Sequence, residues 1–284
     1  MMDRRRKLAM IFEDTRNLYM TDEALQKAIR DCGTELFDSG DCPGLPAPLP
    51  VPGTVRVAKD KSIDAALRIQ KEHPDWKICV LNFASAVQPG GGVLGGSSAQ
   101  EESLCRCSTL YPSLDQPWLW QKYYGVNREA RNNLHTDACI YSSGIVVFKS
   151  DGEEYPVLLP RQDWITVDII SCAAPNLRYS PKNPYNPDSG MPVSISEEEL
   201  YRLHVSRARH ILQVAASKGP DCLILGAFGC GAFENDPDTV AKAYRDVLPE
   251  YLPWFRLVEF AIYCRPYESL NYDAFSREIG SIGV

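Results

Sequence analysis

Two neighbouring glutamates are candidates for proton-transfer chemistry. They lie in the run Gln100-Glu101-Glu102, shortly after a segment that contains Gly90-Gly91-Gly92 and Gly95-Gly96. A glutamate held in a binding site can act as a general acid or base. Glycines allow a positive φ and let main-chain N–H groups approach a ligand, and the start of a helix attracts anions. The segment therefore predicts a phosphate-binding loop next to a proton-transfer residue.

A second glycine-rich segment, residues 226–236, indicates the same kind of site. It contains Gly229, Cys230, Gly231 and Phe233, and it follows an apolar run and precedes a predicted helix. Either segment alone could be a plain connection between a strand and a helix. Because ligands of α/β proteins bind at the carboxyl ends of the strands, two such segments in one domain predict the two walls of a diphosphate site.

Several candidate residues also have an ordinary structural interpretation. Glu101 stands three residues after Ser98, so the two could form a capping box at the start of a helix. Glu102 has no such local role. Asn82 could be a turn residue at the end of a strand, and Phe233 could be a core aromatic residue. The local pattern leaves both interpretations open for these residues.

Strand, loop and helix patterns alternate along the chain. We expect strands at residues 54–57, 77–83, 145–148, 165–171, 222–225 and 257–263. We expect helices at residues 4–31, 62–71 with Ser62 as the cap, 98–110, 197–217 and 237–248. This alternation predicts an α/β fold with helices on both faces of a mixed sheet.

Proline and glycine clusters indicate how the chain is divided. Residues 39–53 are rich in both and separate an N-terminal helical arm, residues 1–53, from a single compact body, residues 54–284. Residues 176–196 are rich in Pro, Asn and Ser and are expected to form a long surface loop.

The composition limits the classes of function. The net charge is −7, so we expect no direct binding to unmodified nucleic acid through its phosphates. The ten cysteines show no C-x-x-C spacing, and they share no metal-ligand spacing with the four histidines. We therefore expect reduced, mostly buried thiols and no metal. The chain contains no apolar signal core and no run long enough to span a membrane, which favours a cytoplasmic protein without a membrane partner.

The glycine triplet and the glutamates together resemble a known family. Gly90-Gly91-Gly92, seven further residues and Gln100-Glu101-Glu102 are similar to the signature of poly(ADP-ribose) glycohydrolases. Segments 81–86, 104–112, 173–176 and 226–237 resemble the microbial-type branch of that family. The resemblance implies a macrodomain-like three-layer α/β/α sandwich with a mixed sheet. It also implies an enzyme without a cofactor that cleaves ribose–ribose O-glycosidic bonds of poly(ADP-ribose) and releases ADP-ribose.

The resemblance further implies roles for the candidate residues. Glu102 corresponds to the catalytic acid, and Glu101 to a carboxylate that positions ribose hydroxyls. Asn82 would face a ribose, and Phe233 would pack against the distal ribose or the adenine. The other candidates would line the two substrate-binding loops: Gly90, Gly91, Gly92, Gly95, Gly96 and Gln100 in the first, and Gly229, Cys230 and Gly231 in the second.

Two other functions agree with parts of the same pattern. A macrodomain that binds ADP-ribose without cleaving it would need the glycine loops, but two carboxylates close to an anion would bring it no advantage. A hydrolase of mono-ADP-ribosyl groups, or of a related ADP-ribose nucleotide, would need both the loops and the acid. The expected partners are poly(ADP-ribose) or ADP-ribosylated macromolecules as the substrate and ADP-ribose as the product.

Overall fold

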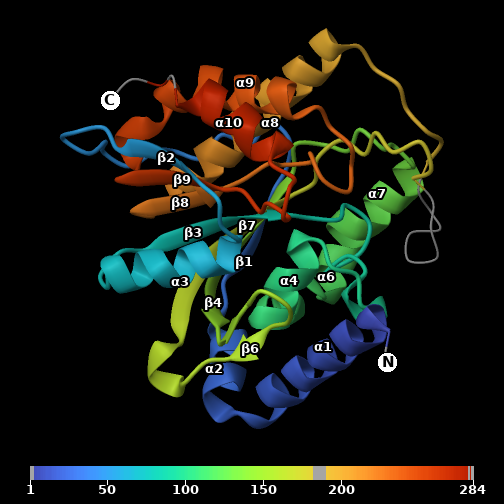
Figure 1. Cartoon of the computed structure of the whole chain (residues 1–284), viewed down its shortest axis with the longest axis vertical. Coiled ribbons are helices and arrows are strands. Elements are labelled where there is room, and N and C mark those ends of the chain that lie inside the picture. The colour runs from blue at the N-terminus through green and yellow to red at the C-terminus, as the bar shows by residue number, and fades with distance from the viewer. Residues whose placement is uncertain (1–2, 182–189, 281, 283–284) are drawn as a thin grey trace.

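A seven-stranded mixed sheet lies at the centre of the protein (Figure 1). The computed structural model describes residues 3–181, 190–280 and 282 of the chain. The strands of the sheet are β1 (Thr34–Phe37), β2 (Thr54–Ala58), β3 (Ile78–Phe83), β4 (Cys139–Val147), β7 (Ile165–Cys172), β8 (Cys222–Leu225) and β9 (Leu257–Ala261). Their order across the sheet is β1-β4-β7-β3-β8-β9-β2.

The direction of the strands brings the carboxyl ends of β3, β7 and β8 to one edge of the sheet. β3 pairs in parallel with both β7 and β8, and β8 and β2 pair in parallel with β9. β4 is antiparallel to its neighbours β7 and β1. Because β3, β7 and β8 run in the same direction in the middle of the sheet, the loops that follow them leave from the same edge.

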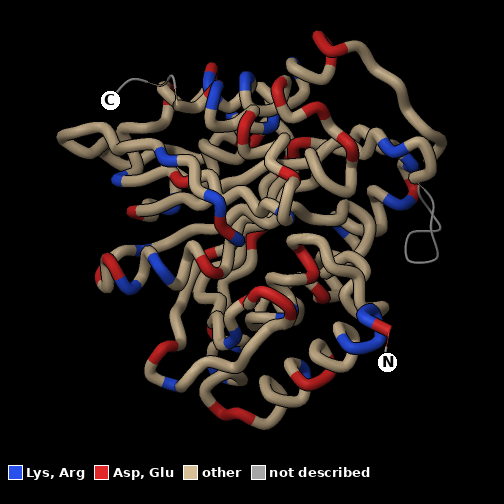
Figure 2. The backbone as a smooth tube through the Cα atoms, in the orientation of Figure 1, with Lys and Arg blue, Asp and Glu red and all other residues tan. Residues whose placement is uncertain are grey.

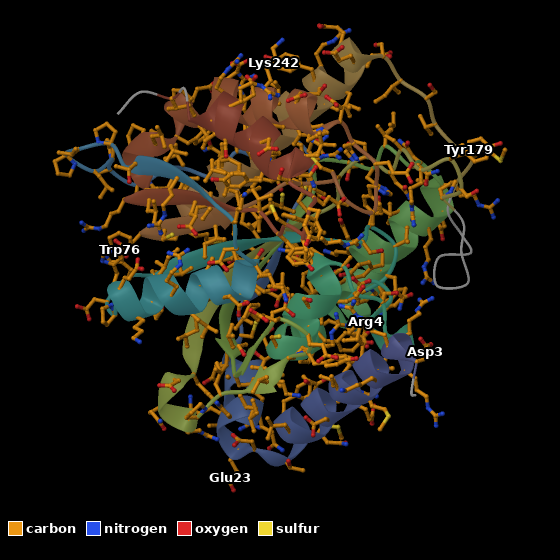
Figure 3. All side chains as sticks on the ribbon, in the orientation of Figure 1. Asp3, Arg4, Glu23, Trp76, Tyr179 and Lys242 are labelled. Carbon is orange, nitrogen blue, oxygen red and sulfur yellow. The ribbon has the colours of Figure 1, made fainter. Side chains whose placement is uncertain are left out.

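Alternating side chains on the strands form a core on each face of the sheet. On β3, Cys79 and Leu81 belong to one core, whereas Ile78 and Val80 belong to the other. Helices cover both faces: α8 (Glu197–Ser217), α9 (Pro237–Val247) and α10 (Leu270–Ile279) on the first, and α3 (Ser62–Glu72) and α4 (Gln100–Cys107) on the second (Figure 1). Side chains fill the space between the layers (Figure 3). The predicted three-layer α/β/α arrangement is confirmed.

Shorter elements complete the second face and its rim. They are α5 (Leu110–Leu114), α6 (Pro117–Leu119), a π-helical turn at Trp120–Tyr124, α7 (Gly125–Ala130), 3₁₀ turns at Val93–Gly95, Arg161–Asp163, Leu248–Glu250 and Leu252–Trp254, and a small hairpin of β5 (Lys149–Ser150) and β6 (Val157–Leu158). None of these was predicted, because elements of two to six residues carry too little periodicity.

The N-terminal arm differs from the prediction in two ways. The helix expected at residues 4–31 is two helices, α1 (Arg4–Thr21) and α2 (Glu23–Asp31), because the Asp22 side chain accepts hydrogen bonds from the N–H groups of Ala24 and Leu25 and starts a new helix. The arm also contributes β1 to the edge of the sheet, beside β4. This strand was missed because it has only four residues.

Other boundaries also differ from those predicted. β4 begins six residues before the expected 145–148, since Gly144, with φ of 74°, forms an irregularity between Ser142 and Ile145 that interrupts the sequence pattern but not the strand. Helix α10 was not predicted. Of the expected loop at 176–196, the described residues before α8 form no helix or strand, and residues 182–189 lie outside the described residues.

Burial and charge follow the expected pattern. All ten cysteines are free thiols, and six of them are buried: Cys79, Cys105, Cys107, Cys139, Cys172 and Cys222. Acidic and basic residues are interspersed over the molecule, with several basic residues close to the N-terminus at the start of α1 (Figure 2). Within the described ranges, no helix is both long and apolar enough to cross a membrane.

Candidate functional site

The two glycine-rich loops lie side by side at one edge of the sheet. The first, residues 84–99, connects β3 to α4, and the second, residues 226–236, connects the neighbouring strand β8 to α9 (Figure 1). Phe83 at the end of β3 packs edge-on against Phe228 of the second loop, with ring centres 5.7 Å apart. A Cβ atom on Gly226 would lie only 2.8 Å from the Phe83 ring. Gly226 therefore allows the bases of the two loops to make direct contact.

The first turn of α4 ties this helix to the first loop. Gln100, Glu101 and Glu102 each accept a hydrogen bond from a different main-chain N–H group, those of Phe83, Ser85 and Gly92, at 2.9, 2.8 and 2.8 Å. Three consecutive side chains thus hold the end of β3, the start of the loop and the glycine triplet in a defined arrangement.

Gln100 fastens the helix to the strand. Besides accepting from Phe83, its amide donates to Leu81 O at 2.8 Å and to Ser62 Oγ at 3.1 Å. Ser62 was predicted to cap α3, but Lys61 occupies the cap position and Ser62 is the first helical residue. Both donors of the Gln100 amide are used by the protein, so its predicted contact with the substrate stays a prediction.

Glu101 is buried under the first loop and does not cap α4. Its side chain is 3% exposed, and Oε1 lies 3.4 Å from the amide nitrogen of Asn82. The predicted capping box with Ser98 is wrong, because Ala99 is the N-cap and the Glu101 carboxyl points to the end of β3 instead. Burial, reinforced by the neighbouring charge of Glu102, raises the pKa of Glu101 well above its ordinary value.

Asn82 contacts Glu101 from the end of β3. It is fully buried, and its amide nitrogen also donates to Ser171 Oγ on β7 at 2.9 Å. Its carbonyl oxygen Oδ1 is buried and has no hydrogen-bond partner among the described residues. Asn82 therefore has a clear positioning contact, while the ribose contact predicted for it remains untested.

Among the described residues, one carboxylate oxygen of Glu102 has a hydrogen-bond donor and the other has none. Oε1 accepts from Gly92 N, whereas Oε2 is buried and has no partner within the described part of the chain. The residue is 7% exposed. A buried polar atom without a partner costs free energy, so Oε2 is the atom of this pair that is available to a substrate group.

The glycine triplet packs its main chain directly onto the two carboxylates. A Cβ atom on Gly91, which has φ of 56°, would lie 2.7 Å from Glu102 Oε1 and 3.0 Å from Glu101 Oε2. A Cβ atom on Gly92 would lie 2.3 Å from Ser97 Oγ, and one on Gly90 would meet Tyr111 at 2.8 Å. Close packing therefore favours glycine at all three positions, and within the triplet Gly91 is the residue that packs on both carboxylates.

The second pair of glycines lies farther along the same loop. Gly95 ends the 3₁₀ turn that follows the triplet. Gly96 is buried, and a Cβ atom there would lie 1.9 Å from the main-chain oxygen of Arg5 in α1. The need for glycine at position 96 thus arises from the approach of the N-terminal helix.

The second loop is held by a buried asparagine that the sequence analysis missed. The Asn235 amide donates to Pro175 O, Gly229 O and Phe233 O at 2.7, 3.1 and 3.2 Å. Its oxygen pairs with His204 Nε2 of α8 at 2.9 Å. Burial lowers the pKa of His204 to about 4, so the imidazole is neutral and Nε2 is the donor. The available signal was an asparagine directly before the Asp-Pro start of a helix.

The remaining candidates of the second loop are more open. Gly229 has φ of 80° and packs against Asn235, whereas Gly231 is exposed with open space around its Cα. Cys230 is half-buried. Phe233 is also half-buried, 6.1 Å from the His135 ring and 5.5 Å from the Arg178 guanidinium, measured between group centres.

The site residues thus form two groups that meet at the base. Asn82, Glu101, Glu102 and the glycine triplet make one group, and Gly229 to Phe233 make the other.

The sequence analysis also missed the contribution of Arg128, which donates to Val87 O and Gln88 Oε1 and holds the first loop from α7. No cluster of metal-binding side chains occurs among residues 3–181, 190–280 and 282.

The fold and this pair of loops define a macrodomain-like α/β protein. Residues 9–150 match the family described as "Microbial-type PARG, catalytic domain", where PARG denotes poly(ADP-ribose) glycohydrolase. The chain belongs to this family. A search among curated protein sequences returned no match.

Solved structures of bacterial relatives cover nearly the whole chain. The poly(ADP-ribose) glycohydrolase of Thermomonospora curvata has 29% identity and a TM-score of 0.78, with 96% of this chain and 99% of that chain covered. The enzyme from Deinococcus radiodurans in complex with ADP-ribose has 33% identity and a TM-score of 0.73, with 90% and 98% covered. A T. curvata structure bound to the inhibitor ADP-HPD has 28% identity and a TM-score of 0.75, with 96% and 99% covered.

Proposed function

We propose that this protein hydrolyses the ribose–ribose O-glycosidic bonds of poly(ADP-ribose) and releases ADP-ribose, with Glu102 as the general acid and base. The observation that carries the proposal is the buried oxygen Oε2 of Glu102, which has no partner in the described part of the chain while Oε1 is fixed by Gly92 N. Family membership and the two loops support the substrate class.

The reaction then proceeds through two proton transfers at one carboxyl group. Protonated Glu102 donates its proton to the ribose oxygen that leaves, and the glycosidic C–O bond breaks with an oxocarbenium-like transition state. The resulting carboxylate takes a proton from water as the water oxygen bonds to the anomeric carbon. Glu102 ends protonated again, so the cycle needs no metal or cofactor.

The neighbouring groups have supporting roles in this proposal. Glu101, whose two oxygens face Ser85 N and Asn82, positions ribose hydroxyls. Gly229 and Gly231 hold the diphosphate through main-chain N–H groups, and Phe233 packs against the distal ribose or the adenine. Cys230 lines the same loop, and its own N–H donates to Ala227 O at 3.1 Å. In this proposal the bound diphosphate also stabilises the cationic transition state, since opposite charges attract strongly in a site that excludes water.

Product analysis distinguishes this function from its alternatives. Purified protein is incubated in EDTA with poly(ADP-ribose), and separately with a mono-ADP-ribosylated protein, and free ADP-ribose is quantified by chromatography. We expect release from the polymer. Release from the mono-modified protein alone would favour the mono-ADP-ribosyl hydrolase, and ADP-ribose binding without release from either substrate would favour a non-catalytic macrodomain.

A further inference from the structure

A buried arginine lies one helical turn after Glu102. Arg106 is 1% exposed, on the inner side of α4. Residues four apart on a helix are neighbours on its surface, so Glu102 and Arg106 share one face. No described carboxylate lies within 4.0 Å of the Arg106 guanidinium nitrogens. Burying a cation without a close ion pair costs free energy. The presence of Arg106 at this buried position therefore needs an explanation.

The guanidinium holds the far end of the first loop. Nη1 donates to Ser97 O at 2.6 Å, and Nη2 reaches Ser103 Oγ at 3.5 Å. Nε is buried and has no partner among the described residues. The N-terminal arm covers this position, since Thr15 Oγ1 donates to Arg106 O at 2.6 Å.

Ser97 connects the arginine to the catalytic carboxylate. Ser97 N donates to Gly92 O at 3.1 Å, and Gly92 N donates to Glu102 Oε1 at 2.8 Å. One turn of α4 then leads from Glu102 back to Arg106. These contacts form a closed ring in which the arginine, the loop and the carboxylate hold one another in place.

The charges around Arg106 make Glu102 its main electrostatic counterpart. The groups that face it are Glu102, Cys105, Cys107 and Asp151. Burial raises the pKa of both thiols well above the ordinary value, so they are neutral. Asp151 already has Lys61 at 3.5 Å. Burial lowers the pKa of Arg106, and the charge of Glu102 is the largest influence in the opposite direction.

We propose that Arg106 is a positioning residue for the hydrolysis, which orients the Glu102 carboxyl through Ser97 and Gly92. This inference rests on the proposed function. The guanidinium fork fixes the Ser97 carbonyl, and the loop fixed in this way holds the Gly92 N–H against the Glu102 carboxyl.

Two substitutions test this role. Arg106→Gln removes the fork and the charge, whereas Arg106→Lys keeps the charge but loses the fork. For Arg106→Gln we expect kcat to fall at least ~10-fold with KM within ~3-fold, since transition-state interactions affect kcat. Arg106→Lys should also lower kcat without raising KM, because a single ammonium group cannot reproduce the fork.

A second buried arginine provides a matched control. Arg207 on α8 is also 1% exposed and bonds to Asp137 and the Ala173 and Leu134 carbonyls. Arg207→Gln should reduce stability and leave kcat unchanged. If Arg106→Gln does not fold, Arg106→Lys still decides, because the proposal predicts a lower kcat at an unchanged KM for this variant as well.

The results distinguish this inference from the proposed function. Wild-type kcat in both Arg106 variants would overturn the positioning role, while activity of the wild-type protein upheld the function. A lower kcat in Arg106→Gln together with a wild-type kcat in Arg106→Lys would show that the guanidinium fork does not orient the carboxyl. Absence of ADP-ribose release by the wild-type protein would overturn the proposed function and this inference together.

Discussion

Three adjacent side chains at the start of α4 differ in their hydrogen-bond partners and burial. Gln100 bonds to both a main-chain N–H and a carbonyl group of β3, Glu101 lies buried under the loop, and Glu102 keeps one oxygen free. The sequence analysis recognised these residues as a group but misassigned the local role of Glu101. A capping box depends on main-chain geometry at Ser98, which only the folded loop determines.

Replacing Glu101 should change the pH dependence of stability. Because the pKa of Glu101 is raised in the folded protein, the folded state binds the proton more tightly than the unfolded state, and stability falls as pH rises from about 4.5 through the raised value. Glu101→Gln removes this loss. We expect the variant to be more stable than wild type at pH 8, with the difference shrinking towards pH 4.5.

Urea unfolding at pH 8, 6 and 4.5 measures this difference. The exposed Glu153 provides a control, since Glu153→Gln should leave the unfolding free energy within about 0.5 kcal/mol at each pH. A Glu101→Gln protein that is less stable than wild type at pH 8 would show that the carboxylate is stabilised by its hydrogen bonds more than it is penalised by burial.

Gly91→Ala tests the packing of the triplet on the carboxylates. The new Cβ would lie 2.7 Å from Glu102 Oε1, so it must displace the Glu102 carboxyl. If Glu102 is the acid that we propose, kcat should fall at least ~100-fold, as for loss of the acid itself. Gly219 has a similar φ of 63° with nothing within 4 Å. Gly219→Ala therefore introduces comparable backbone strain without the clash and should retain kcat. Equal kcat values in the two variants would contradict this explanation.

At the scale of elements, the regular alternation was predictable and the short pieces were not. The buried strands β3 and β8 and the long helix α8 were found close to their observed bounds because each has a strong apolar pattern. β1 and the short helices around residues 110–130 depend on contacts with distant segments. The same reason explains why Asn235 was missed, since its partners come from the loop after β7, the second loop itself and α8.

The second loop should depend on the donor capacity of Asn235. Asn235→Asp has nearly the same shape but cannot donate to Pro175 O, Gly229 O and Phe233 O. We expect calorimetric affinity for ADP-ribose to fall at least ~10-fold, a loss of about 1.4 kcal/mol, because the loop that we propose for the diphosphate is no longer fixed.

A neighbouring cap serves as the control for this variant. Asp236 caps α9 by accepting from Thr239 N at 2.8 Å. Asp236→Ala should cost about 1 kcal/mol of stability with little change in affinity. Wild-type affinity in a folded Asn235→Asp protein would mean that the second loop does not need this anchor to bind the ligand.

At the scale of the whole molecule, the buried histidines should limit stability in acid. The pKa of His204 is lowered to about 4 and that of His135 to about 3, both chiefly by burial. The unfolded chain binds these protons near pH 6.5, so stability present above pH 6.5 is lost as pH falls towards 4. The raised pKa of Glu101 has the opposite effect on the pH dependence of stability. A single-residue variant therefore measures the contribution of one histidine better than the pH dependence of the whole protein does.

His204→Gln isolates one of these contributions. Glutamine can still donate to Asn235 Oδ1 but does not titrate. Between pH 7.5 and pH 5 we expect wild type to lose about 2 kcal/mol more unfolding free energy than the variant, measured by urea titration at both pH values. The same loss in both proteins would show that His204 is accessible to protons in the folded state.

The overall architecture was predictable because its causes are distributed over many residues. The layer arrangement and the two loops at one sheet edge follow from alternation and connection rules. The proposed reaction was predicted from the resemblance of the glycine triplet and Gln100-Glu101-Glu102 to a family signature. The orientation of Glu102 was not predictable, since it depends on the hydrogen bond that the folded first loop donates from Gly92 N.

The central claim is that Glu102 transfers the proton, and Glu102→Gln tests it most directly. The rate of ADP-ribose release from poly(ADP-ribose) and the calorimetric affinity for ADP-ribose are measured on the same preparations of wild type, Glu101→Gln and Glu102→Gln. We predict at least ~100-fold slower release by Glu102→Gln, affinity within about 3-fold of wild type, and a smaller loss for Glu101→Gln. Near-normal release by Glu102→Gln, or a larger loss for Glu101→Gln, would contradict the assignment.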